Sequence, residues 1–176
     1  MYSKMMIDDL REKLDSKEAT GEELFSEANE MAHKYQSEYN SFVTIIDEYK
    51  NEGIKDTLIT NIPYALKDLF STKGILTTGS SNILKNYVPV YDSTVYKKLK
   101  EAGGLLVGKT VLDELAMGGT GTTGHTGIVK NPWDKERMIG GSSSGSAVAV
   151  ALGIVPFAIG SDTGDSVRKP ACYGGV

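Results

Sequence analysis

Two short stretches rich in glycine and serine constrain the fold most, because each lies directly beside an apolar segment. Residues 140–146 read GGSSSGS and lead into a run of small residues, 147–152, that predicts a helix. Residues 160–166 read GSDTGDS and follow an apolar run, 155–159, that predicts a strand. Glycine lets a backbone approach a ligand closely, and a serine hydroxyl becomes a nucleophile once a base takes its proton. Because the neighbouring apolar segments are too short to be separate domains, we interpret both stretches as functional loops rather than flexible linkers.

The remainder of the sequence predicts helices and strands in alternation. Apolar residues at helical spacing predict a helix within residues 5–17, and a capping box formed by Thr20 and Glu23 begins a second helix. Further strands are predicted at residues 42–46, 62–66 and 105–107, further helices at 93–102 and 111–117, and a loop at 118–128. Strands that alternate with helices favour a layered α/β fold.

Composition and charge limit the possible partners. The 176 residues are 40% hydrophobic and 24% charged, which is typical of one soluble globular domain. A net charge of −4 gives the whole chain no strong field for nucleic acid, so such a partner would bind a local patch or another subunit. The single cysteine, Cys172, excludes an internal disulfide, and no apolar run reaches membrane-spanning length. Without a secretory signal at its N-terminus, the chain is expected to be cytoplasmic and to need no membrane.

The last residues suggest that the sequence is part of a longer chain. It stops at Tyr173–Val176, soon after the second glycine-rich loop. A glycine followed by valine is typical of the start of another strand, so we expect a fragment.

Two glycine patterns match nucleotide-binding motifs, but their surroundings argue against that function. Residues 103–110 match the phosphate loop, yet that motif requires loop backbone where residues 105–107 predict a strand. The glycines of residues 119–124 match the dinucleotide fingerprint, which requires a preceding strand where residues 113–117 predict a helix. We interpret the first match as a coincidence and the second as a structural loop.

The first serine loop also matches the nucleophile elbow of the α/β hydrolases, with Gly141 and Gly145 as its glycines. That mechanism requires a later histidine, and none follows His125 unless further chain supplies one. With two histidines and one cysteine, the chain is a poor candidate for a His-based triad or a metal site.

A lysine is the remaining base for a serine nucleophile. Lysine acts as a base only when neutral, so burial or nearby positive charge must lower its pKa. Lys67 ends an apolar strand and has that opportunity. The other lysines near the motifs lie in more polar segments: Lys109, Lys130 and Lys135.

The two loops and the lysine segment together resemble the amidase signature family. The resemblance rests on GGSSSGSA at residues 140–147, GSDTGDSVRKPA at residues 160–171 and PYALKD at residues 63–68. It implies a layered α/β/α fold with a mixed central sheet, here incomplete. Residues 1–176 would then be the N-terminal part of one amidase-signature domain, with a helical clamp at about 1–40 and a truncated catalytic core at about 41–176.

The resemblance also implies a catalytic triad of two serines and a lysine. Ser166 would be the acyl-forming nucleophile, Ser142 would relay the proton, and Lys67 would be the base. In this family the relay serine follows a cis peptide bond. The backbone N–H groups of Thr163, Gly164, Asp165 and Ser166 would form the oxyanion hole.

Supporting roles are expected for other residues around the loops. Asp162 and Arg168 are interpreted as a pair that fixes the second loop. Ser143 and Ser146 are expected to cap the helix that follows them. Asp68 is expected to orient the backbone or Lys67.

Ser144 and Asp165 stand where many family members have glycine. Asp165 is the more consequential departure, because it places a carboxylate beside the nucleophile. An inward-facing Asp165 would raise the pKa of Lys67 and slow base catalysis, whereas an outward-facing one would be harmless.

Within the family, residues 107–110, 113–118 and 131–134 are most similar to the A subunits of glutamyl-tRNA(Gln) amidotransferases. That branch implies a glutaminase that works with a B and a C subunit. The ammonia would be used by the partner that activates glutamyl-tRNA(Gln). That partner would also make most of the contacts with the tRNA. No cofactor is expected in this chain, while ATP and Mg²⁺ would be used by the whole complex. Two alternatives stay open, a stand-alone amidase for a small-molecule amide and an inactive fragment.

Overall fold

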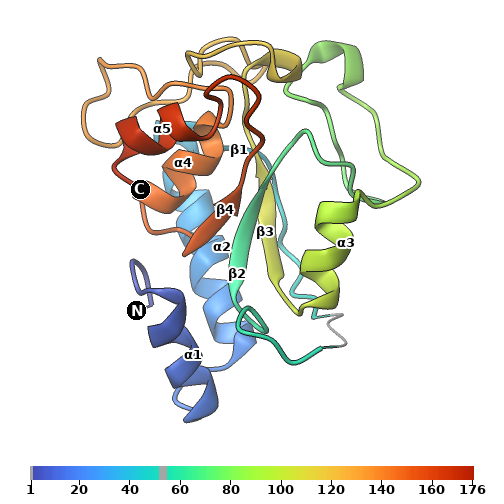
Figure 1. The fold of residues 1–176 in the computed structure, drawn as a ribbon, viewed down its shortest axis with the longest axis vertical. Coiled ribbons are helices and arrows are strands. Elements are labelled where there is room, and N and C mark those ends of the chain that lie inside the picture. The colour runs from blue at the N-terminus through green and yellow to red at the C-terminus, as the bar shows by residue number, and fades with distance from the viewer. Residues whose placement is uncertain (1, 52–54) are drawn as a thin grey trace.

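The computed structural model describes residues 2–51 and 55–176 (Figure 1). Helices and strands follow one another in the order α1 Ile7–Asp15, α2 Gly21–Tyr39, β1 Phe42–Ile45, β2 Pro63–Lys67, α3 Thr94–Glu101, β3 Leu105–Thr110, α4 Ser144–Ala151, β4 Phe157–Ile159 and α5 Arg168–Gly174. Short 3₁₀ turns lie at Asn82–Leu84 and Glu114–Ala116. Within the described residues, no helix is both long and apolar enough to cross a membrane.

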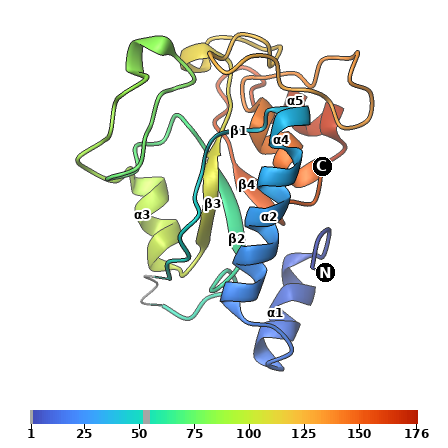
Figure 2. The same ribbon diagram turned by 180° about the vertical axis from the view of Figure 1, so that it is seen from behind.

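The strands form one mixed sheet in the order β1-β3-β2-β4. Strand β2 pairs in parallel with both β3 and β4, whereas β1 pairs with β3 in antiparallel fashion. Helix α3 lies on one side of the sheet, and α2 and α4 lie on the other (Figures 1 and 2). The predicted layered α/β/α arrangement with a mixed sheet is therefore confirmed.

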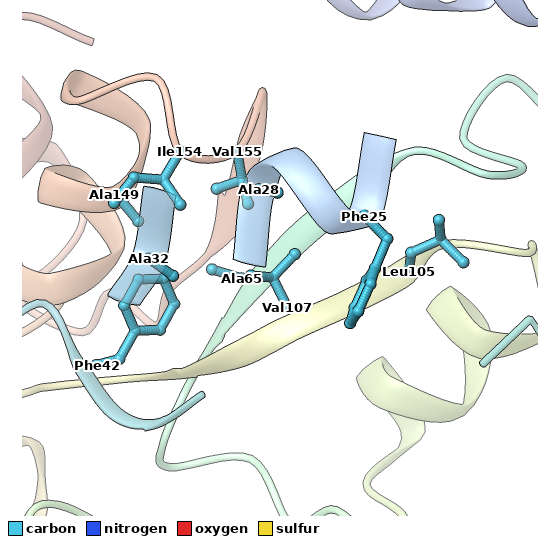
Figure 3. Packing of buried hydrophobic residues seen from close by; sticks show 10 residues of the cluster. All are labelled: Phe25, Ala28, Ala32, Phe42, Ala65, Leu105, Val107, Ala149, Ile154 and Val155. Atoms are coloured by element: carbon cyan, nitrogen blue, oxygen red, sulfur yellow. The ribbon is translucent and has the colours of Figure 1, made fainter. Parts of the chain in front are cut away.

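Alternating side chains of the central strands build a separate core on each face. Ala65, Leu105 and Val107 pack with residues of α2 and with the segment around α4 (Figure 3). Tyr64, Leu66 and Leu106 point the other way and pack under α3. Because both faces of β2 and β3 are covered, these strands are apolar almost without interruption.

The N-terminal helices begin where the sequence predicts. Thr20 caps α2, since its hydroxyl accepts from the N–H of Glu23 at 3.2 Å and its own N–H donates to the Glu23 carboxylate at 2.8 Å. Helix α1 packs through Leu10 against Leu24 and Ile62. The division into a clamp and a core stays a prediction.

One predicted helix is wrong. Residues 111–117 form only the short 3₁₀ turn, and Leu115 and Ala116 have positive φ angles of 52° and 61°. The N–H of Leu115 donates to the carbonyl of Gly79 instead of closing a helical turn. The two glycine patterns behave as interpreted, since residues 105–110 form strand β3 and residues 119–124 form a loop.

Three other elements differ from expectation by two or more residues at one end. Strand β3 extends past residue 107 to Thr110, because it is paired on both sides. Helix α4 starts at Ser144, inside the first serine loop, and β4 covers only the last three residues of its apolar run. The two loops therefore lie at the ends of α4 and β4 that face the end of β2.

Candidate active site

Lys67 is the last residue of β2, and its side chain is fully buried. Its Nζ lies 2.7 Å from the hydroxyl of Ser142, 2.9 Å from the hydroxyl of Ser161 and 3.3 Å from the carbonyl oxygen of Ser161, all within hydrogen-bond distance. Burial lowers the pKa of Lys67 to about 8, although the carboxylates of Asp113 and Asp162 oppose the shift. A lysine in this state supplies a substantial neutral fraction near neutral pH, which a general base requires.

Ser142 lies in the first serine loop, two residues before α4, and is 1% exposed. The peptide bond between Gly141 and Ser142 is cis, as the family resemblance implied. The carbonyl of Ser142 accepts from the N–H of Asp113 at 3.1 Å. The side chain of Ser142 thus contacts Lys67, and the backbone carbonyl of Ser142 contacts Asp113.

Ser166 reaches the site through its backbone. Its carbonyl accepts from the N–H of Ser143 at 2.9 Å, which ties the second loop to the first. Within the described part of the chain, the hydroxyl of Ser166 makes no hydrogen bond to Ser142 or to another protein group. The structure therefore joins Lys67 to Ser142 directly and holds Ser166, which is partly exposed, in the adjoining loop.

The loop that carries Ser166 is closed by the pair expected from the sequence. Two guanidinium nitrogens of Arg168 donate to Asp162 at 2.9 and 3.1 Å. The same carboxylate accepts from the N–H groups of Val167 and Arg168 at 3.0 and 3.1 Å. The Arg168 guanidinium, followed by these backbone bonds, holds the pKa of Asp162 well below its usual range.

The four N–H groups assigned to an oxyanion hole lie inside this closed loop. Among the described residues, none of the N–H groups of Thr163, Gly164, Asp165 and Ser166 donates a hydrogen bond. Thr163 and Gly164 are exposed. These four donors therefore have no acceptor among the described residues.

Asp165 does not approach the lysine. Its carboxylate forms an ion pair with Lys169 at 2.5 Å, and this contact raises the pKa of Lys169. The carboxylates that raise the pKa of Lys67 are those of Asp113 and Asp162. Of the two orientations considered for Asp165, the structure has the one that leaves the base unaffected.

Ser143 and Ser146 do not cap α4, contrary to expectation. Ser143 occupies the N-cap position, but its hydroxyl accepts from the N–H of Ser161 and donates to the Ser161 carbonyl, both at 3.3 Å. The hydroxyl of Ser146 contacts the Thr110 hydroxyl at 2.7 Å and the Ile159 carbonyl at 3.1 Å. Both side chains are structural, and they tie α4 to the sheet and to the second loop.

Ser161 is a site residue that sequence reasoning missed. Its hydroxyl and carbonyl both accept from Lys67, and its backbone is held by Ser143. The sequence could have indicated Ser161 only together with the strand order. In the parallel pair of β2 and β4, Leu66 lies beside Ile159. A residue just past β4 then lies beside Lys67 at the same sheet edge.

Lys109 is a second buried lysine, although the sequence placed it in a polar segment. Its Nζ lies 3.2 Å from the Asp68 carboxylate and donates to the Thr77 hydroxyl at 2.8 Å and the Phe70 carbonyl at 3.0 Å. Burial lowers the pKa of Lys109, and Asp68 opposes that shift. Asp68 also accepts from the N–H and hydroxyl of Thr78. The alternative that Asp68 orients Lys67 is thus not seen.

The two buried lysines face opposite sides of the sheet. A register shift in β3 leaves Val107 unpaired with β2, so that Leu66 lies beside Lys109 and Lys67 lies beside Thr110. Lys109 therefore joins the face of Leu66, under the loop that follows β2. Lys67 joins the face of α4, where the serine loops are.

No group of three or more histidine, cysteine, aspartate or glutamate side chains that could hold a metal ion occurs in the described residues. The arrangement is instead that of a buried lysine with two serine hydroxyls, beside a closed loop whose N–H groups have no acceptor among the described residues. A sequence model of the Amidase family matches residues 16–176.

The chain belongs to the amidase family.

A subunits of glutamyl-tRNA(Gln) amidotransferases are among its most similar relatives. The A subunit of the glutamyl-tRNA(Gln) amidotransferase from Oenococcus oeni is 47% identical over 176 residues. Its counterpart from Streptococcus pneumoniae is 44% identical over 184 residues. The crystal structure of the counterpart from Thermotoga maritima superimposes with a TM-score of 0.86 at 40% identity.

The amidase-family chain corresponds to only part of these relatives. The matches cover 95%, 99% and 97% of this chain, but 36%, 38% and 37% of the three relatives in the same order.

Proposed function

We propose that this amidase-family chain carries the catalytic serines and lysine of a glutaminase that supplies ammonia for the conversion of glutamyl-tRNA(Gln) to glutaminyl-tRNA(Gln). The single observation that carries the chemistry is the buried contact of 2.7 Å between Lys67 and Ser142. The identity of 44–47% to the A subunits of glutamyl-tRNA(Gln) amidotransferases supports glutamine as the substrate.

The contacts of Lys67 fit a neutral amine with one acceptor position. The carbonyl of Ser161 can only accept, and the Ser161 hydroxyl accepts a second N–H. These two bonds use both N–H groups of a neutral lysine, so its lone pair faces Ser142. The Ser142 hydroxyl then donates its proton to Nζ and becomes the acceptor for the proton of Ser166.

Each step of the proposed reaction uses a group of this site. Ser166 attacks the side-chain carbonyl carbon of glutamine as its proton passes through Ser142 to Lys67. The N–H groups of residues 163–166 stabilise the oxyanion of the tetrahedral intermediate. Protonated Lys67 returns the proton through Ser142 to the leaving ammonia. Water, activated by the same relay, hydrolyses the glutamyl ester, so that glutamine and water yield glutamate and ammonia.

The partners and cofactors of the proposed function lie outside this chain. A B and a C subunit would complete the complex, and glutamyl-tRNA(Gln) would be bound mainly by the partner. ATP and Mg²⁺ would serve the activation of glutamyl-tRNA by the whole complex. The chain itself needs no cofactor for the glutaminase step.

The test uses the complete gene product, purified with the B and C subunits. We expect glutamine-dependent formation of glutaminyl-tRNA(Gln), which Ser166→Ala abolishes while ammonium chloride still supports it. The matched control is Ser146→Ala, which removes a hydroxyl that does not contact Lys67. Hydrolysis of small amides without any dependence on the B subunit would favour the stand-alone amidase, and absence of both activities would refute the proposed function.

A further inference from the structure

Asp113 has a fully buried carboxylate to which the proposed reaction gives no role. The backbone of residues 120–123 wraps around it. The carboxylate accepts from the N–H groups of Thr120, Gly121, Thr122 and Thr123 at 2.9, 3.0, 3.0 and 3.2 Å, and from the Thr123 hydroxyl at 3.0 Å. Burial alone would raise the pKa of Asp113, but these hydrogen bonds outweigh it and hold the pKa below its usual value. The group is therefore ionised.

The other side of Asp113 lies against the peptide that carries the relay serine. Its N–H donates to the carbonyl of Ser142 at 3.1 Å. A Cβ atom on Gly141 would lie 2.0 Å from the carboxylate oxygen Oδ2. Only glycine at position 141 lets the carboxylate approach the Gly141–Ser142 peptide this closely.

We propose that Asp113 is the positioning residue for Ser142, which it holds against Lys67 by clamping the Gly141–Ser142 peptide to the loop of residues 120–123. The inference rests on the proposed function, because it concerns the geometry of that proton relay. It also explains the glycine pattern of residues 119–124. Their loop presents N–H groups to an internal carboxylate instead of a nucleotide.

The charge of Asp113 gives this role a signature that a merely structural residue would lack. The charged groups that act on Lys67 are the carboxylates of Asp113 and Asp162, while its direct partners, Ser142 and Ser161, are neutral. A carboxylate favours the protonated lysine, so removal of the Asp113 charge lowers the pKa of Lys67 further.

The experiment compares Asp113→Asn with the wild type in the complete gene product. The Lys67 Nζ is titrated by NMR in ¹⁵N-lysine-labelled protein, with Lys67→Arg to assign the signal, and glutaminase kcat/KM is measured against pH. We expect the titration and the rise of kcat/KM to move to lower pH together. The maximal rate should fall about a hundredfold, because Ser142 is displaced.

Thr123→Val is the matched control, since it removes one hydroxyl donor to Asp113 and keeps the charge. Its Lys67 titration should stay at the wild-type position. A folded Asp113→Asn protein with unchanged titration and unchanged maximal rate would overturn the inference, as would a Thr123→Val protein with the same titration shift. If Asp113→Asn does not fold, Gly141→Ala decides. It keeps every group of Asp113 but places a methyl against Oδ2, and wild-type turnover would overturn the inference.

The NMR titration needs no substrate, so it separates this inference from the proposed function. A shifted titration in a protein without glutaminase activity would refute the function and leave the placement of Asp113 intact. If the wild type is active and Asp113→Asn shows an unshifted Lys67 titration and wild-type turnover, the proposed function stands and the inference about Asp113 is refuted.

Discussion

The side-chain nitrogen of Lys67 lies 2.7 Å from the hydroxyl of Ser142, although the two residues are 75 positions apart in the chain. Both side chains are excluded from solvent, at 0% and 1% exposure. The contact forms because β2 ends at Lys67 and α4 begins just after Ser142, on the same face of the sheet. The chemistry proposed for this chain depends on that meeting point.

The pH dependence of glutaminase activity should report the state of Lys67. Because the pKa of Lys67 is lowered to about 8 and only the neutral amine is a base, kcat/KM should rise with pH and reach half its maximum near pH 8. Lys67→Arg should lose activity at every pH, since arginine stays charged. A flat profile between about pH 7 and 9 would contradict this assignment.

The hydroxyl of Ser161 should contribute to catalysis although it does not react. Ser161→Ala removes one of the acceptors that orient Lys67, so kcat should fall about tenfold to a hundredfold, because Lys67 becomes charged in the transition state and loses a hydrogen bond there. Ser161→Thr keeps a hydroxyl and should recover most of that loss. Ser146→Ala is the control, and equal effects of the two alanine variants would refute the role of Ser161.

The buried pair of Lys109 and Asp68 should matter for stability. Lys109→Met leaves the carboxylate of Asp68 buried without its partner, so the free energy of unfolding should fall by about 3–5 kcal/mol. Lys109→Met combined with Asp68→Asn should recover part of this loss. Lys135→Met breaks the half-exposed pair with Glu38 and should lower the free energy of unfolding far less, because solvent screens that pair. Urea unfolding of the four proteins measures these differences, and a Lys109→Met protein as stable as Lys135→Met would contradict the prediction.

Much of the fold was predictable because its signals are local. The capping box of Thr20 and Glu23 set the start of α2, and the apolar run before Lys67 marked a buried strand. The hydroxyl-rich loops and Lys67 could be named as site residues, and the structure joins Lys67 to Ser142. The roles of Ser166 and of the N–H groups of residues 163–166 remain predictions.

The features that the sequence did not predict arise from contacts between distant segments. The register shift at Val107 places Lys109 on the sheet face of Leu66, where its side chain is buried, although its neighbours in the chain look polar. The helix expected at residues 111–117 does not form, because Leu115 bonds to Gly79 and the Asp113 carboxylate is held by residues 120–123. Ser161 was missed because its role depends on β4 lying beside β2.

The most direct measurement is the identification of the acylated residue. The complete gene product, with its partner subunits, is mixed with glutamine, quenched in acid during turnover, digested and analysed by mass spectrometry. We predict a glutamyl ester on Ser166, which is absent from Ser166→Ala, and unmodified Ser142 and Ser161. A glutamyl ester on Ser142 or Ser161, or full glutaminase turnover by Ser166→Ala, would contradict the proposed relay from Ser166 through Ser142 to Lys67.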